Sequence, residues 1–187
     1  MTTAGLLLAA GAGRRMGTPK ALVHDPDGTS WLRRSVRVLL DGGCGPVHVV
    51  LGAGAEDARV LVADLPVEVV VADDWDSGMG ASLRAGLLAV ADASGGSDTV
   101  LVSLVDLPDV GASVVARVLA AGTGPAALAR ASYDGEPGHP VLLGADHLAP
   151  LVATLHGDVG AKPYLAGHDV TLVECGDLAT GRDRDTR

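Results

Sequence analysis

The chain lacks phenylalanine altogether, and aromatic residues make up only 2% of its 187 positions. Its core therefore cannot be built from stacked rings and must come from aliphatic side chains, which dominate a composition that is 48% hydrophobic. Short strands of valine, leucine and alanine are typical of a parallel sheet that helices bury on both faces. A chain of this length can bury one full core, so we expect a single domain over residues 1–187.

Cysteine and long apolar runs are also scarce. Cys44 and Cys175 are too few and too far apart for a zinc site or a disulfide framework, and we expect each to be a small buried hydrophobe. No apolar run reaches the roughly 18 residues of a membrane helix, and the amino terminus lacks a basic region followed by a cleavable apolar segment. We therefore expect a cytoplasmic protein with no membrane partner.

Positive charge is in short supply. The 23 acidic residues outnumber the 14 basic ones, which gives a formal net charge of −9. This balance argues against general binding to nucleic acid or to anionic membranes. Any anion site must be a local basic spot, so the cluster of Arg14, Arg15 and Lys20 near the amino terminus is informative.

The turn at residues 11–20 has the chemistry of an anion site. It follows an apolar run, 6–10, that predicts a buried strand. Its three glycines allow backbone amides to approach a phosphate closely, and Arg14, Arg15 and Lys20 add positive charge. The glycine spacing fits neither the dinucleotide-binding fingerprint nor the P-loop.

Short aliphatic strands alternate with amphipathic helices over most of the chain. This alternation predicts the α/β class, with a Rossmann-like, doubly wound, mostly parallel sheet and helices on both faces. Ligands of such sheets bind outside the carboxyl ends of the strands, where the turn at 11–20 would lie. The expected strands are 6–10, 47–51, 68–72 and 99–104, and the expected helices are 30–40, 55–63, 81–91 and 112–121.

Beyond residue 121 the pattern changes. Strands at 126–133 and 140–143, joined by a turn at 134–138, predict a hairpin with His139 at the base of the turn. Such a hairpin usually covers a site or makes a subunit contact. The remaining expected elements are a helix at 147–155, a turn at 157–162 and a strand at 169–174.

Two aspartates follow the most clearly buried strand, 99–104. Asp106 comes just after its carboxyl end, where a carboxylate can hold a divalent cation. Asp109 suits the N-terminal cap of the helix at 112–121, and Ser30 suits the same role for the helix at 30–40.

Several short motifs follow one another along nearly the whole chain. They are LAAGAGRRMGTPK at 8–20, WDSGMGASL at 75–83, VDLP at 105–108, GHP at 138–140, GDVGA at 157–161 and DRDT at 183–186. In this order they resemble the signature of the nucleotidyltransferases related to the molybdenum-cofactor cytidylyltransferases and guanylyltransferases. The resemblance implies the fold of nucleotide-diphospho-sugar transferases and a nucleotidyltransferase domain.

The resemblance also implies a reaction. An enzyme of this kind passes a nucleoside monophosphate from a nucleoside triphosphate, with Mg²⁺ as cofactor, to a phosphorylated acceptor and releases pyrophosphate. Arg15 and Lys20 would hold the β- and γ-phosphates, and Asp106 would hold the metal. The nucleotide contacts that the resemblance implies are Ala9, Ala10, Gly11, Ala12, Gly13, Arg15, Lys20, Gly80 and Ser82.

The resemblance assigns the acceptor and a second metal ligand to later segments. Family members most often have arginine where Lys162 stands, and lysine lacks the planar fork of arginine. One tail aspartate, Asp183 or Asp185, looks like a second metal ligand, although a tail of alternating charge usually frays. The expected acceptor contacts are His139, Asp158, Gly160 and Lys162.

Two small residues bear on the choice of nucleotide. The pair Ala9-Ala10 resembles the cytidylyltransferase branch, whereas guanylyltransferases usually carry a glycine pair there, so CTP is favoured. The acceptor would then be the molybdopterin form of the molybdenum cofactor, with a molybdoenzyme as a further partner.

Two other functions stay open. The stretches 11–15, 19–23 and 175–182 also resemble a branch associated with nicotine blue oxidoreductase, which would make the protein an NAD(P)H-dependent reductase. The intact Asp106 and Lys20 favour the transferase, because a reductase has little need of both. The third function is a non-catalytic, nucleotide-binding chaperone for molybdoenzyme assembly.

Overall fold

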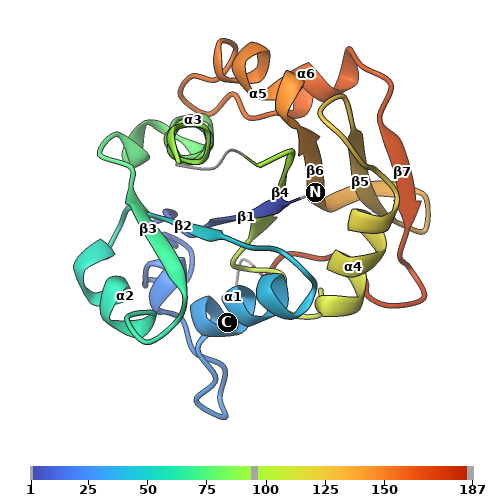
Figure 1. Cartoon of the computed structure of the whole chain (residues 1–187). Coiled ribbons are helices and arrows are strands. Elements are labelled where there is room, and N and C mark those ends of the chain that lie inside the picture. Colours follow the sequence, from blue (N-terminus) through green and yellow to red (C-terminus); the bar gives the residue numbers. More distant parts are fainter. Residues whose placement is uncertain (1, 94–96, 185–187) are drawn as a thin grey trace.

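A seven-stranded sheet forms the middle layer of the computed structural model, which describes residues 2–93 and 97–184. The strand order is β3-β2-β1-β4-β6-β5-β7 (Figure 1). The strands are β1 (Thr3–Leu8), β2 (Val47–Leu51), β3 (Val67–Val71), β4 (Thr99–Leu104), β5 (Leu128–Tyr133), β6 (Glu136–Gly144) and β7 (Thr171–Glu174).

The sheet is mostly parallel. Strand β1 pairs in parallel with β2 and β4, and β2 pairs in parallel with β3. Strand β6 runs antiparallel to β4 and β5, and β7 pairs in parallel with β5. This arrangement confirms the predicted α/β class and the doubly wound, mostly parallel sheet.

Helices cover both faces of the sheet, as predicted (Figure 1). The face with α1, α2 and α4 lies opposite the face with α3, α5 and α6. The helices are α1 (Trp31–Asp41), α2 (Ala55–Leu61), α3 (Met79–Asp92), α4 (Ala112–Ala120), α5 (Ala145–Val152) and α6 (Lys162–Ala166), with 3₁₀ turns η1 (Lys20–Leu22) and η2 (Trp75–Ser77). No helix within the described ranges is long and apolar enough to cross a bilayer.

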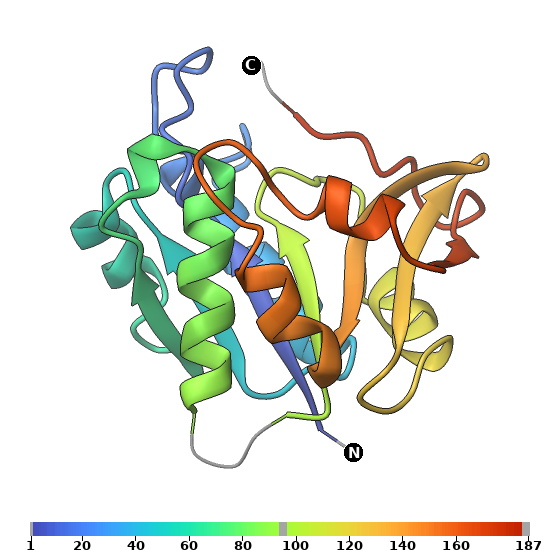
Figure 2. The same ribbon diagram turned by 90° about the horizontal axis from the view of Figure 1, so that it is seen from above.

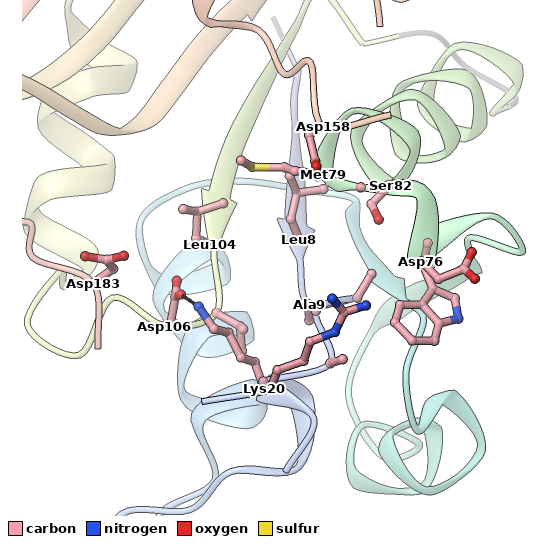
Figure 3. A pocket seen from close by; sticks show the side chains of 18 residues that line it. Leu8, Ala9, Lys20, Asp76, Met79, Ser82, Leu104, Asp106, Asp158 and Asp183 are labelled. Carbon is pink, nitrogen blue, oxygen red and sulfur yellow. Dashed lines mark hydrogen bonds and ion pairs between the residues drawn. The ribbon is translucent and has the colours of Figure 1, made fainter. Parts of the chain in front are cut away.

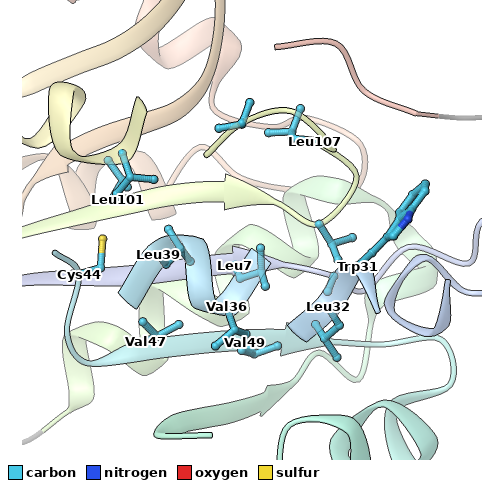
Figure 4. Packing of buried hydrophobic residues seen from close by; sticks show 14 of the residues in the cluster. Leu7, Trp31, Leu32, Val36, Leu39, Cys44, Val47, Val49, Leu101 and Leu107 are labelled. Carbon is cyan, nitrogen blue, oxygen red and sulfur yellow. The ribbon is translucent and has the colours of Figure 1, made fainter. Parts of the chain in front are cut away.

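Two aliphatic layers pack between these helices and the sheet. Neighbouring residues of a strand point to opposite faces, so Leu7 joins Val49 and Val36 under α1, whereas Leu6 packs with Leu87 of α3 (Figure 4). The predicted cap of α1 is confirmed, because the Ser30 hydroxyl accepts a hydrogen bond from the backbone N–H of the third helical residue at 3.3 Å.

Both cysteines are buried, as expected from the sequence. Cys44 belongs to the layer under α1, and burial raises the pKa of its thiol to about 12. Cys175 is 0% exposed and belongs to the same hydrophobic cluster.

The hairpin differs from the prediction. Strand β6 already begins at Glu136, so His139 lies within a strand and not at the base of a turn. Glycine and proline in this segment suggested a turn, but Pro137 pairs with Ser132 of β5 across a register shift that absorbs the irregularity.

The predicted helix cap at Asp109 is wrong. Gly111 occupies the N-cap position of α4, and no side chain caps that helix. The Asp109 carboxylate instead accepts hydrogen bonds from the backbone and the hydroxyl of Thr180 near the C-terminal end of the described chain.

Candidate functional site

Two cavities of similar size open at the carboxyl ends of β1 and β4, the edge where ligands bind in sheets of this type. The Lys20 cleft, of about 500 Å³, is lined by 8–14, Lys20, Ser82, 104–106 and Asp183, among others (Figure 3). The Arg130 cavity, of about 510 Å³, is lined by Arg130, Glu136, His139, Gly160, Lys162 and a set of aliphatic side chains. Leu8, Met79 and Asp158 border both cavities.

The turn after β1 closes on itself and returns Lys20 to the cleft. The backbone N–H of Lys20 donates to the carbonyl of Gly11 at 3.0 Å, and the N–H of Met16 donates to Gly13 at 2.8 Å. Gly13 has φ +57°, and a Cβ atom there would lie 1.9 Å from the Thr18 carbonyl oxygen. A glycine is therefore required at this point of the turn.

Backbone amides line the floor of the Lys20 cleft. Within the described part of the chain, the N–H groups of Gly11, Ala12 and Gly13 donate to no other residue. Successive amides of this kind form a concave site that attracts anions. Arg14 also lines the cleft, whereas Arg15 is exposed on the same turn and is not among the lining residues.

Asp106 is buried just beyond β4, with 5% of its surface exposed. The Lys20 ammonium group donates a hydrogen bond to its carboxylate and forms an ion pair with it (Figure 3). Charge pairing of this kind offsets the cost of burying a carboxylate. The cleft thus joins an amide cradle to a paired cation and anion.

Asp183 lies in the same cleft as Asp106. Figure 3 shows it on the side of Asp106 away from Lys20. Mg²⁺ usually takes one or two protein carboxylates together with phosphate oxygens and waters. No group of three or more metal-ligating side chains occurs among the residues that the structure describes. Two carboxylates therefore suit a divalent cation that is shared with a phosphate ligand.

The described part of the C-terminal segment is held against the sheet by hydrogen bonds, although tails of alternating charge usually fray. It runs along the carboxyl ends of the central strands (Figure 2), and the Arg184 backbone N–H donates to the Asp106 carbonyl at 2.9 Å. Asp185, the alternative metal ligand of the sequence analysis, lies outside the described residues.

The start of α3 contributes to the cleft differently from the prediction. Ser82 is buried and lines the Lys20 cleft, as predicted. Trp75 and Met79, which the sequence analysis did not select, also line this cleft. Gly80 is not among the lining residues, because its backbone N–H donates to the Gly157 carbonyl at 2.8 Å and packs the helix start against the following turn.

The predicted acceptor residues lie together in the Arg130 cavity. His139, Asp158, Gly160 and Lys162 come from β6 and from the turn that leads to α6, and all four line this cavity. Its other walls are largely aliphatic, so the Arg130 cavity is less polar than the Lys20 cleft.

Arg130 is the cation of this cavity that the sequence analysis missed, and Glu136 is a further charged lining residue that it did not select. Its Nε and Nη2 atoms donate to the Gly138 carbonyl at 3.2 and 3.0 Å. Burial lowers the pKa of its guanidinium group. Burial, together with Arg130, also lowers the pKa of His139 to about 4, so that His139 is neutral at pH 7. A lone cation inside the predicted strand 126–133 was the available sequence signal.

Comparison with known proteins gives one family and several relatives. The model of the MobA-like NTP transferase domain matches residues 5–172. Nicotine blue oxidoreductase of Paenarthrobacter nicotinovorans is 36% identical over 192 residues, which cover 97% of this chain and 91% of the relative. A probable molybdenum cofactor guanylyltransferase of Rhodopirellula baltica is 34% identical over 106 residues, 57% of this chain and 49% of that protein.

Solved structures share the whole fold. Rv0371c from Mycobacterium tuberculosis H37Rv superposes with a TM-score of 0.81 and 28% identity over 100% of this chain and 93% of its own. A complex of the same protein with manganese gives a TM-score of 0.77 and 25% identity over 98% and 94% of the two chains.

Proposed function

The chain belongs to the family of MobA-like NTP transferase domains, and we propose that it transfers a nucleoside monophosphate from a nucleoside triphosphate to a phosphorylated acceptor. The observation that carries this proposal is the composition of the Lys20 cleft. It places the backbone amides of 11–13, which donate to no other described residue, beside the Lys20–Asp106 pair and next to the Arg130 cavity. Phosphoryl chemistry between two bound substrates needs such an arrangement.

The reaction needs positioning and charge neutralisation more than a general base. An oxygen of the acceptor phosphate attacks the α-phosphorus, and the bond from that phosphorus to the bridging oxygen breaks. Pyrophosphate leaves with the bonding electrons. Because the attacking phosphate is already ionised, holding the two substrates in line supplies most of the acceleration.

The residues of the Lys20 cleft, together with Arg15 on the exposed side of the same turn, divide this work. The amides of 11–13 would bind the triphosphate, and Lys20 and Arg15 would neutralise its β- and γ-phosphates as the charge of pyrophosphate develops. Asp106 and Asp183 would hold Mg²⁺, which when bound neutralises the triphosphate. The manganese complex of the Mycobacterium tuberculosis relative supports a divalent cation in this fold.

The Arg130 cavity would hold the acceptor. Its aliphatic walls suit a ring system, and Arg130 and Lys162 suit an anionic group on it. We propose CTP as the donor, because of the pair Ala9-Ala10, and a molybdopterin-type acceptor. The relative from Rhodopirellula baltica, a probable molybdenum cofactor guanylyltransferase, supports this class of acceptor. A molybdoenzyme would be the recipient of the product.

Calorimetric titration with CTP, GTP, ATP and NADPH, each with and without Mg²⁺, tests the proposal. We expect tight binding of CTP that depends on Mg²⁺, and release of pyrophosphate when molybdopterin is added. Metal-independent binding of NADPH, without binding of any triphosphate, would instead support a reductase like the Paenarthrobacter nicotinovorans relative. Triphosphate binding with no turnover on any acceptor would support a chaperone.

A further inference from the structure

Two sets of side-chain contacts hold the C-terminal segment, residues 180–184, at the edge of the sheet where the central strands end. At one end, the backbone N–H and the hydroxyl of Thr180 donate to one oxygen of Asp109, at 2.6 and 2.7 Å. Burial acts to raise the pKa of Asp109, but these hydrogen bonds outweigh it and hold the pKa below its usual value. Asp109 is therefore an anion at pH 7 and a strong acceptor.

Arg184 provides the second set of contacts, on the other side of Asp183. Its Nη1 atom donates to Asp25 Oδ1 at 2.9 Å, and its guanidinium carbon lies 5.7 Å from the centre of the Trp31 ring. Trp31 is 1% exposed and donates from Nε1 to the same Asp25 oxygen at 2.9 Å. Asp25 also pairs with Arg34 through its other oxygen. Arg184 thus docks on a cluster at the start of α1 whose members also bond to one another.

The middle of the segment packs on Tyr133 of β5. Gly181 has φ +64°, and a Cβ atom there would lie 2.0 Å from the ring of Tyr133. The hydroxyl of Tyr133 donates to the carbonyl of His139 at 2.6 Å. The segment therefore packs on a ring that is hydrogen-bonded to His139, a lining residue of the Arg130 cavity, while it places Asp183 in the Lys20 cleft.

We propose that Arg184, Asp25 and Trp31 form a latch that positions Asp183 for the metal site, although none of the three lines the Lys20 cleft. This inference rests on the metal-dependent function proposed above. Without the latch, the last residues would gain backbone freedom and Asp183 would spend little time beside Asp106. Partners that orient a metal ligand typically change metal affinity about 10- to 100-fold.

Binding of Mn²⁺ alone, followed by the electron paramagnetic resonance of the free ion, tests the latch. The variants are Arg184→Ala, Arg184→Lys, Asp183→Asn, the Arg184→Ala/Asp183→Asn double variant and Asp106→Asn. Arg33→Ala is the matched control, because Arg33 lies on α1, the helix that carries Trp31, and its ion pair is with Asp64, which lies beyond α2 and outside the segment. Trypsin cleavage after Arg182 gives a second readout that does not depend on metal.

We expect Arg184→Ala to weaken Mn²⁺ binding about tenfold and to speed cleavage after Arg182. The double variant should bind no more weakly than Asp183→Asn, because Arg184 acts through Asp183. Arg184→Lys should fall between wild type and Arg184→Ala, since lysine keeps the charge but not the planar group. Arg33→Ala should match wild type in both readouts.

Three outcomes would overturn the latch. Arg184→Ala could bind Mn²⁺ as tightly as wild type, the two substitutions could weaken binding additively, or Asp183→Asn could leave binding unchanged. In each case a loss of binding in Asp106→Asn would still support the proposed metal-dependent function. Unchanged binding in Asp106→Asn, or no binding to wild type, would count against both.

Discussion

The two cavities differ in how the chain builds them, although their volumes are almost equal and they share three bordering residues. The Lys20 cleft takes its amides and its cations from one continuous turn, 9–20. The Arg130 cavity collects its polar side chains from β5, β6 and the turn at 157–162, and its aliphatic ones from β1, α3, β4, β6 and the segment that ends in α6. Phosphate can be bound by backbone and charge in one short motif, whereas an acceptor of specific shape needs a surface assembled from distant segments.

The largest loss of turnover is expected from substitution of the ion pair in the Lys20 cleft. Lys20→Ala and Asp106→Ala should each lower turnover by about 10³-fold or more, because each removes charge neutralisation at the transferring phosphate. Release of pyrophosphate with saturating CTP and acceptor measures this loss. Circular dichroism should show an unchanged fold, since both residues lie at the rim of the sheet.

Arg117→Ala is the matched control for these two variants. It removes an ion pair with Asp177 that lies outside both cavities. Its turnover should equal that of wild type. Wild-type turnover in either Lys20→Ala or Asp106→Ala would show that the chemistry does not take place in the Lys20 cleft.

Arg130→Ala should affect the acceptor and not the nucleotide. A hydrogen bond to a charged group contributes about 1.5–3 kcal/mol, so we expect KM for the acceptor to rise about 10- to 100-fold while the affinity for CTP stays constant. Arg130→Lys, which keeps the charge, should recover part of the loss. Steady-state kinetics with either substrate varied provides the measurement. A rise in KM for CTP alone would place the donor in the Arg130 cavity.

Substitution of Gly13 in the turn should have the opposite effect and weaken binding of the nucleotide but not of the acceptor. Gly13→Ala meets both an unfavourable φ and the Thr18 carbonyl, and should cost at least about 2 kcal/mol of stability. It should also weaken CTP binding about tenfold, the value of one or two hydrogen bonds. Gly17→Ala has a similar φ, +69°, but open space around it, and should cost about 1 kcal/mol with normal CTP binding.

Urea unfolding and calorimetry test this pair of variants together. Equal loss of CTP affinity in Gly13→Ala and Gly17→Ala would show that the shape of the turn around Gly13 is not what binds the triphosphate. Binding of the acceptor should be unaffected in both, because neither glycine lines the Arg130 cavity.

The chemistry of the Lys20 cleft could be argued from the sequence itself, whereas the residues of the Arg130 cavity were predicted only through the family resemblance, for the same reason that the two cavities differ. The strand, the glycines and the cations of the turn are neighbours in the chain, so the apolar run and the residues that follow it already indicated an anion site. Strand β6 contains Pro137 and Gly138, which suggested a turn, and tertiary pairing with β5 overrode that local preference. Fraying was considered for the tail because its charges alternate, and its partners, Asp25 and Asp109, could not be identified because they are far away in sequence.

The smallest effect should come from His139, the half-buried histidine of the Arg130 cavity. Its pKa is lowered to about 4 in the folded protein, against about 6.5 when unfolded. Between these values the unfolded state binds more protons, so the stability that neutral His139 retains at pH 7 is lost as the pH falls from about 6.5 to about 4.

His139→Gln keeps a neutral polar side chain and removes this titration. Urea unfolding of both proteins at several pH values should show that the stability of wild type falls relative to the variant across that window and levels off below it. His48, whose pKa burial also lowers, is present in both proteins and cancels in the difference. Parallel curves would mean that His139 is solvated in the folded protein, and that the Arg130 cavity is as open to water as the Lys20 cleft.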